Sequence, residues 1–337
     1  MANKKLTRVL SIDGGGIRGV LPGQIMVAIE QQLQKKTNNP EARLADYFDL
    51  MAGTSTGGIL CAIYLTPDES GRPKYTAEQA VNLYLENGGD IFKKKMFSFG
   101  GITNEKYPSA PMEEALEKYL GDAKLSEMIK ECLITSYDIE RSNPHFFKRH
   151  KAKDNKGYDF YMRDVARSTS AAPTYFEPNH ATSFAEVKYA LIDGGVYVNN
   201  PTLCAYAATR KLDFGEDKIK PTASEMMMVS IGTGSTKYSY EYEKAKDWGA
   251  IGWIKPLIDI MMKGVSQTVD YQLKQIFDAV GKPDQYHRIE PKLVHAVSGM
   301  DNAEKENLIN LRADGSESAL DNEDKINKIV DMLIANA

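Results

Sequence analysis

Two glycine clusters, each lying directly after a short apolar run and before a helix-like stretch, most constrain the fold of this chain. The first cluster joins the apolar run 6–12 to helical spacing over 17–33. The second occupies 53–58, between the apolar run 48–52 and the helix-like stretch 59–65. A strand, a glycine turn and a helix in immediate succession are typical of parallel sheets whose strands are joined by crossover helices. The sequence therefore predicts an α/β fold.

Further strand-like runs continue this alternation, each ending at a polar or glycine-containing turn: 132–137, 189–192 and 226–231. Beyond about 235 the chain becomes rich in helix-like stretches that contain tryptophan and methionine, and it closes with a helix predicted over 322–335. We expect one domain over 1–337, with an α/β core at 5–235, a mainly parallel central sheet, and a mainly helical C-terminal extension at 236–337.

Composition excludes several classes of function. The formal net charge of the 337 residues is −4 and the pI is about 5.9, so no global positive field is available to hold a nucleic acid polymer. The three cysteines, Cys61, Cys132 and Cys204, are widely spaced and form no CxxC pair, which predicts neither a disulfide framework nor a zinc site. With no signal-peptide pattern and no apolar run long enough to cross a bilayer, we expect a cytoplasmic protein whose membrane contact is peripheral. Oligomeric state stays open.

The motif GxSxG occurs at Gly53 to Gly57, with Ser55 at its centre. It lies between a predicted strand and a predicted helix, the context in which this motif forms a nucleophile elbow. The flanking glycines fit a strained turn in which a neighbouring Cβ would collide with the adjoining strand or helix. Ser55 is therefore the candidate nucleophile, and the alternative for the motif alone is an ordinary Gly/Ser/Thr turn.

A serine hydroxyl needs a base to accept its proton, and Asp193 is the best candidate. It follows the apolar run 189–192 and precedes two glycines, so we expect its carboxylate at the same edge of the sheet as Ser55. A partly desolvated aspartate bonded to the serine could accept the proton. His287 and His295 satisfy the chain order of a Ser-Asp-His triad, but neither follows a strand in a glycine-rich loop, so a Ser55/Asp193 dyad requires fewer assumptions.

The glycine loop at 13–19, with sequence DGGGIRG, resembles an oxyanion hole because its amides can converge at a helix N-terminus. Gly14, Gly15 and Gly16 are the candidate donors, and Arg18 adds positive charge near a developing anion or a lipid phosphate. The same stretch also matches GxGxxG, the dinucleotide-binding pattern, which keeps a nucleotide-binding oxidoreductase open as an alternative. The acidic residue expected about 20 residues further on, at the end of the next strand, is replaced there by the Gly53 to Ser55 turn.

Three motifs in this order, DGGGIRG at 13–19, GTSTGG at 53–58 and DGG at 193–195, resemble the patatin-like phospholipases. The segments 168–176, 199–201 and 232–234 are also similar to that family, and the resemblance covers roughly residues 5 to 235. It implies a modified α/β-hydrolase sandwich that hydrolyses acyl esters of membrane glycerophospholipids through an acyl-enzyme. It also implies Ser55 as nucleophile, Asp193 as base, Gly14, Gly15 and Gly16 with Arg18 at the oxyanion, and no metal or organic cofactor.

The region after 235 looks similar to bacterial patatin-like proteins, including antiphage effectors activated by a cyclic dinucleotide. That resemblance alone motivates a cyclic dinucleotide activator and a role in phage defence. A second hypothesis concerns the run Phe92 to Phe99, where three lysines lie beside three phenylalanines and a methionine. This combination suits a phospholipid membrane surface. A catalytically silent lipid-binding protein of the same shape is the alternative to an enzyme.

Overall fold

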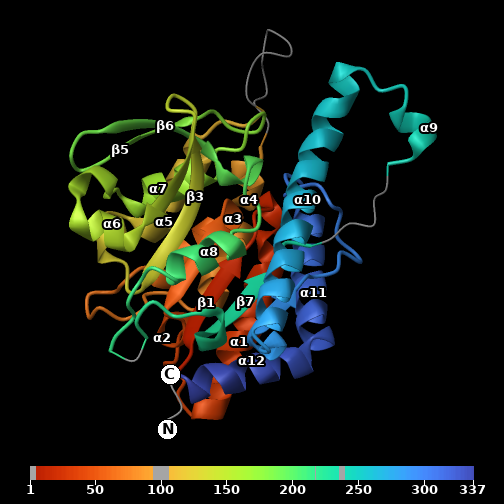
Figure 1. Cartoon of the computed structure of the whole chain (residues 1–337). Coiled ribbons are helices and arrows are strands. Elements are labelled where there is room, and N and C mark those ends of the chain that lie inside the picture. The colour runs from red at the N-terminus through yellow and green to blue at the C-terminus, as the bar shows by residue number, and fades with distance from the viewer. Residues whose placement is uncertain (1–4, 94–105, 217, 235–239) are drawn as a thin grey trace.

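The structure is a computed structural model that describes residues 5–93, 106–216, 218–234 and 240–337 (Figure 1). Within these residues the chain forms one eight-stranded sheet in the order β5-β6-β3-β2-β1-β7-β8, with β4 pairing to β3 off this path. The strands are β1 (Thr7–Ile12), β2 (Leu50–Thr54), β3 (Glu131–Asp138), β4 (Asn143–Lys148), β5 (Asn179–Thr182), β6 (Lys188–Asp193), β7 (Met226–Ile231) and β8 (Tyr286–Ile289).

The centre of the sheet is parallel. β1 pairs in parallel with β2 and β7, β2 with β3, and β7 with β8. The antiparallel pairs lie at the end of the sheet that is opposite to β8. There β3 pairs with β4 and β6, and β5 pairs with β6. The predicted α/β fold with a mainly parallel central sheet is confirmed.

Helices cover both faces of the sheet, and the side chains of β1 show how. Val9 belongs to an apolar cluster with Val269, Leu273 and Phe277, whereas the adjacent Leu10 belongs to the cluster on the opposite face. Because successive side chains of a strand point to opposite faces of the sheet, β1 contributes to two separate apolar clusters, one on each face. The longer helices are α1 (Val20–Thr37), α3 (Thr56–Leu65), α4 (Ala77–Ile91), α5 (Ala110–Leu120), α7 (Met162–Thr169), α8 (Thr202–Thr209), α10 (Ala250–Ala279), α11 (Lys305–Asp321) and α12 (Glu323–Ala335).

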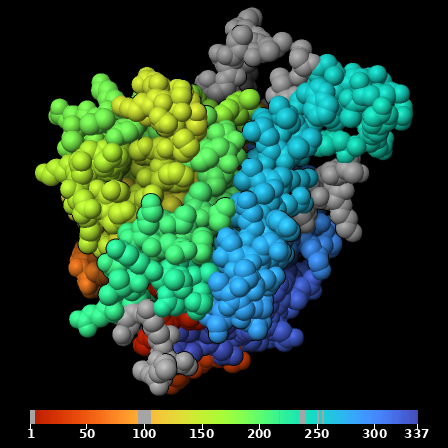
Figure 2. All heavy atoms as spheres, viewed as in Figure 1, coloured from red at the N-terminus to blue at the C-terminus, as the bar shows by residue number. Residues whose placement is uncertain are grey.

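The C-terminal region is built into the core. Its helices α11 and α12 pack against α1. On the opposite face α10 lies beside α8, and the space-filling view shows these two segments, blue and green, next to each other (Figure 2). The region predicted as mainly helical also supplies β8, which pairs with β7 and extends the sheet. Among the described helices, none is long and apolar enough to cross a membrane.

The sequence prediction missed three strands, β4, β5 and β8. β4 and β5 have several exposed or half-buried positions, and β5 and β8 are only four residues long. A short strand at the edge of a sheet has one partner and little apolar surface to bury, so its sequence carries a weak pattern. The five predicted strands are β1, β2, β3 and β7, which form the buried centre of the sheet, and β6, which lies beside them.

Candidate active site

Ser55 lies at a strained turn between β2 and α3, as the GxSxG motif predicts. Its φ of 53° and ψ of −123° lie in a region that side chains other than glycine rarely adopt. The turn requires close backbone approach, because a Cβ on Gly53 would lie 2.3 Å from the Gly57 carbonyl oxygen and one on Gly57 would lie 2.2 Å from that of Ile12. The strand-turn-helix context therefore forces the serine hydroxyl out at the end of the sheet.

The turn is fastened by Thr169 at the end of α7. The Ser55 amide donates to the Thr169 hydroxyl oxygen at 2.8 Å, and that hydroxyl donates to the Thr135 carbonyl at 2.6 Å. The backbone N–H of the serine is thus used to hold the turn. The Ser55 amide is therefore not a free donor for a reacting oxyanion.

Asp193 ends β6 and is 5% exposed. Its Oδ1 accepts a 2.7 Å hydrogen bond from the Gly195 amide, and its carboxylate also interacts with the Ser55 hydroxyl. Burial raises the pKa of this carboxyl to about 7, against the opposing effect of the hydrogen bonds from Ser55 and Gly195. A carboxylate with a pKa near neutrality is a far better proton acceptor than an ordinary aspartate. The structure brings together the two side chains that the sequence analysis singled out.

The approach of Asp193 to Ser55 has a different origin from the one expected for a parallel sheet. β6 runs antiparallel to β3, with Asp193 opposite Ser136. β2 reaches only as far as Thr135 on β3, and the last three residues of β3, 136–138, continue beyond it to pair with β6. β6 therefore runs antiparallel along the part of β3 that extends past β2, and its last residue, Asp193, lies next to the end of β2.

The glycine loop after β1 contributes Gly15 and Gly16 to a cavity that also contains Ser55 and Asp193. Gly16 has a φ of +59°, and a Cβ there would lie 2.2 Å from the Met300 carbonyl oxygen. Of the three predicted donors, Gly14 differs from the other two, because its amide donates to the Asn199 carbonyl at 3.0 Å. In this structure the Gly14 N–H is therefore occupied, and Gly15 and Gly16 carry the loop into the cavity.

Arg18 lies beside the glycine loop. The side chain is buried, donates from Nε to the Gly15 carbonyl at 3.4 Å and from Nη1 to the Gly234 carbonyl at 3.3 Å, and is not among the residues that line the cavity. These contacts tie the loop to the end of β7. In this structure the guanidinium braces the backbone of the loop. Its assistance to the oxyanion stays a prediction.

The cavity has a volume of about 160 Å³. It extends from Ser55 and Asp193 between α4, α5 and α10, and its wall is almost entirely apolar. The side chains that supply this wall include Ile59, Leu83, Ile91, Phe92, Met112, Leu116, Phe176, Ile258, Met261, Met262 and Met300. A buried serine hydroxyl in an apolar cavity suits an ester of a long hydrocarbon acid.

The histidines lie elsewhere. His287 is buried on β8, and burial lowers its pKa to about 4, while His295 is half exposed and faces Glu317 at 3.6 Å. None of the five histidines lines the cavity of Ser55. Among the described residues, His295, Asp314 and Glu317 are close enough to share a metal ion, but the Asp314 carboxylate already accepts backbone amides of residues 294–296.

The predicted membrane-docking run Phe92 to Phe99 lies largely outside the described residues, which end at Lys93 and resume at Lys106. Phe92 itself is described. It lines the cavity and forms an edge-on contact with Tyr107, with ring centroids 5.4 Å apart. This aromatic ring therefore belongs to the cavity wall.

A family model described as Patatin-like phospholipase matches residues 10–206. The chain belongs to the patatin-like phospholipase family. Patatin-like protein 1 of Arabidopsis thaliana is 36% identical over 92% of this chain and 80% of its own length. Patatin group J-1 of Solanum tuberosum is 34% identical over 90% of this chain and 81% of its own length.

Membership of the patatin-like family supports a lipid acyl hydrolase activity. Among solved structures, VipD from Legionella pneumophila matches with a TM-score of 0.38 and 12% identity over 96% of this chain and 67% of that chain, a likeness too distant to inform function.

Several residues that hold the site were not predicted individually. Thr169 fastens the serine turn, the Asn199 carbonyl accepts from Gly14, and the Thr233 hydroxyl donates to the Gly14 carbonyl at 2.6 Å. Their segments, 168–176, 199–201 and 232–234, were noted only for their similarity to the family. Ser266 and Arg288, which contact Asp13, lie where the sequence carries no recognised motif.

Proposed function

We propose that this protein hydrolyses acyl esters of membrane glycerophospholipids with a Ser55/Asp193 dyad and an acyl-enzyme intermediate. The observation that carries the proposal is the buried carboxyl of Asp193, which interacts with the Ser55 hydroxyl in an apolar cavity that both residues line. Family membership supports the substrate class, and the geometry supports the residues.

In the proposed reaction, the Ser55 oxygen attacks the ester carbonyl while Asp193 accepts the hydroxyl proton. The carbonyl oxygen becomes an oxyanion that the amides of Gly15 and Gly16 stabilise, a contribution worth about 10²- to 10³-fold in rate per donor. Collapse of the tetrahedral intermediate breaks the ester bond, and Asp193 returns the proton to the departing alcohol. Water then attacks the acyl-enzyme and gives a proton to Asp193. Asp193 passes this proton to the departing Ser55 oxygen, which frees the fatty acid and regenerates the serine hydroxyl.

The experiment compares wild type with Ser55→Ala on a p-nitrophenyl acyl ester and on phospholipid vesicles, with released fatty acids identified by mass spectrometry. We expect hydrolysis by wild type only, and labelling of Ser55 by a fluorophosphonate. Equal hydrolysis by both proteins rejects the nucleophile. Lipid binding without hydrolysis or labelling favours the catalytically silent alternative.

The oxidoreductase alternative has little support in the loop geometry. Asp13 pairs with Arg288, and the amides of Gly14 and Ile17 donate to protein carbonyls, so few donors are left for a pyrophosphate. Turnover of a nicotinamide cofactor would revive it.

Activation by a cyclic dinucleotide, a role in phage defence, a cytoplasmic location and peripheral membrane contact stay predictions. Isothermal titration with a panel of cyclic dinucleotides tests the first, and absence of heat with all of them contradicts it. Sedimentation with liposomes tests membrane contact through the lysine-rich run, with Phe97→Ala/Lys94→Ala as the variant.

A further inference from the structure

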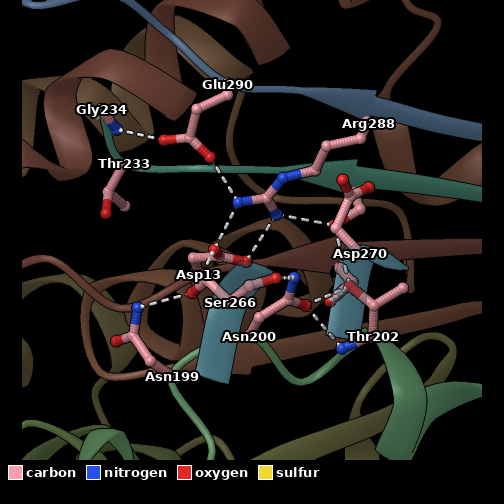
Figure 3. A network of polar contacts seen from close by, with 12 residues as sticks. Asp13, Asn199, Asn200, Thr202, Thr233, Gly234, Ser266, Asp270, Arg288 and Glu290 are labelled. Carbon is pink, nitrogen blue, oxygen red and sulfur yellow. Dashed lines mark hydrogen bonds and ion pairs between the residues drawn. The ribbon is translucent and has the colours of Figure 1, made fainter. Parts of the chain in front are cut away.

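A buried ion pair lies directly behind the glycine loop. Asp13 is the first residue after β1, and its carboxylate accepts from both terminal nitrogens of Arg288 on β8 (Figure 3). Arg288 Nη1 lies 2.9 Å from Asp13 Oδ1, and Nη2 lies 2.7 Å from Oδ2. The side chains are only 3% and 10% exposed. This pairing joins residues 275 positions apart in the sequence.

The pair needs an arginine. Besides its two bonds to Asp13, the guanidinium donates from Nη1 to the Ser230 hydroxyl at 2.8 Å and from Nη2 to Glu290. The four N–H groups of the two terminal nitrogens thus have four acceptors. A lysine ammonium carries three N–H groups on one atom and cannot reproduce this arrangement.

Glu290 extends the contact to the far side of the loop. Its Oε1 accepts from the Gly234 amide at 3.1 Å, and the Gly234 carbonyl accepts from Arg18. Next to it, Thr233 donates to the Gly14 carbonyl. Arg288 thus also holds the segment that follows β7 against the glycine loop, through Glu290.

A second connection comes from α10. The Ser266 hydroxyl donates to Asp13 Oδ2 at 3.2 Å and accepts from the Asn199 side-chain amide at 3.2 Å. The Asn199 carbonyl in turn accepts from Gly14. Figure 3 shows Asp13, Ser266 and Asn199 converging at the end of the loop.

We propose that Arg288 is a positioning residue for the oxyanion loop: by clamping Asp13 it fixes the direction of the Gly15 and Gly16 amides toward the reacting oxygen. This inference rests on the proposed function and extends it, because it makes the C-terminal region part of the catalytic apparatus. Arg288 does not line the cavity of Ser55, so its effect on the reaction has to pass through Asp13. Preorganised amides lose effectiveness when the backbone that carries them can shift.

The chain offers a matched control at the other end of β1. Arg8 pairs with Asp49 through Nε and Nη2 at 3.1 and 3.0 Å, and these side chains are 5% and 11% exposed. Arg8→Lys therefore disturbs a buried bidentate pair on the same strand, away from the glycine loop. Lys218 also donates to Asp49, at 2.8 Å, so Asp49 keeps a second cationic partner in Arg8→Lys. The general cost to stability in Arg8→Lys should therefore be no larger than in Arg288→Lys.

The experiment measures three quantities for wild type, Arg288→Lys and Arg8→Lys: the second-order rate of Ser55 phosphonylation, kcat and KM on a soluble ester, and Tm. We expect Arg288→Lys to lower the phosphonylation rate and kcat by at least about tenfold, since loss of a single oxyanion donor costs about 10²- to 10³-fold. KM should change less than about twofold, because the cavity wall is untouched. Arg8→Lys should lower Tm by no more than Arg288→Lys does and leave both rates near those of wild type.

Rates for Arg288→Lys equal to those of wild type overturn the proposal, as does an equal loss of rate in both variants at equal Tm. Should Arg288→Lys fail to fold, the uncharged pair Asp13→Asn/Arg288→Gln is compared with Asp49→Asn/Arg8→Gln, and the same two outcomes decide. Failure of the proposed function looks different: wild type is then neither phosphonylated at Ser55 nor distinguishable from Ser55→Ala.

Discussion

The raised pKa of Asp193 predicts that this carboxylate destabilises the protein at the pH where it would act as a base. The folded-state pKa is about 7, compared with an ordinary value of 3.8, and burial is the main cause. Each pKa unit corresponds to about 1.4 kcal/mol, so the free energy of unfolding loses about 4 kcal/mol as pH rises from below 3.8 to above 7. The sign follows because the folded state holds the proton that the unfolded state releases between these two values.

Asp193→Asn removes this titration and keeps an oxygen to accept from the Gly195 amide. The difference in free energy of unfolding between variant and wild type should shift in favour of the variant by about 1.4 kcal/mol per pH unit from pH 4 to 7, then stay constant. Urea unfolding of both proteins at pH 5, 6, 7 and 8 measures this difference, and all other titrating groups cancel in it. A difference that does not vary with pH refutes the reasoning.

Activity should show the opposite dependence. The base must be ionised, so kcat/KM of wild type on a soluble ester should rise with pH to a plateau above about 7, losing about tenfold per unit below it. Asp193→Asn should be inactive throughout while being the more stable protein at pH 8. Such a trade between stability and function is expected for a carboxylate held in an apolar site.

Two further predictions concern the serine turn and the cavity. Thr169→Val removes the acceptor of the Ser55 amide and leaves that N–H buried without a partner, so we expect a loss of about 1–3 kcal/mol in the free energy of unfolding and a lower kcat; unchanged kcat and urea midpoint would contradict this. Ala115→Leu enlarges a buried side chain on the cavity wall, so the preference among p-nitrophenyl esters of increasing length should move toward shorter chains, and an unaltered preference would remove α5 from the acyl site.

The centre of this fold could be predicted from sequence because its strands are buried on both faces. β1 and β7 consist wholly of buried residues, so their apolar runs stand out. The glycines that follow β1 and surround Ser55 are imposed by neighbouring backbone and side-chain atoms, which leave no room for a Cβ. β8 could not be found in this way, since it is four residues long and carries His287 and Arg288 among its side chains. The glycines of the motifs could be recognised because local backbone geometry requires them. Arg288 could not, because its bidentate ion pair constrains only a partner that is distant in the sequence.

The position of Asp193 illustrates a different limit. An aspartate after an apolar run was expected at the same sheet edge as Ser55, on the assumption that strands run in parallel, and the carboxylate does lie there. Yet β6 runs against β3, and its last residue reaches the edge only because β3 continues past the end of β2. Gly194 then permits the turn, since a Cβ there would lie 2.1 Å from the Thr135 hydroxyl oxygen. Strand direction and overhang are set by pairing between distant segments, so the residues of a site can be read from sequence while the reason that they meet cannot.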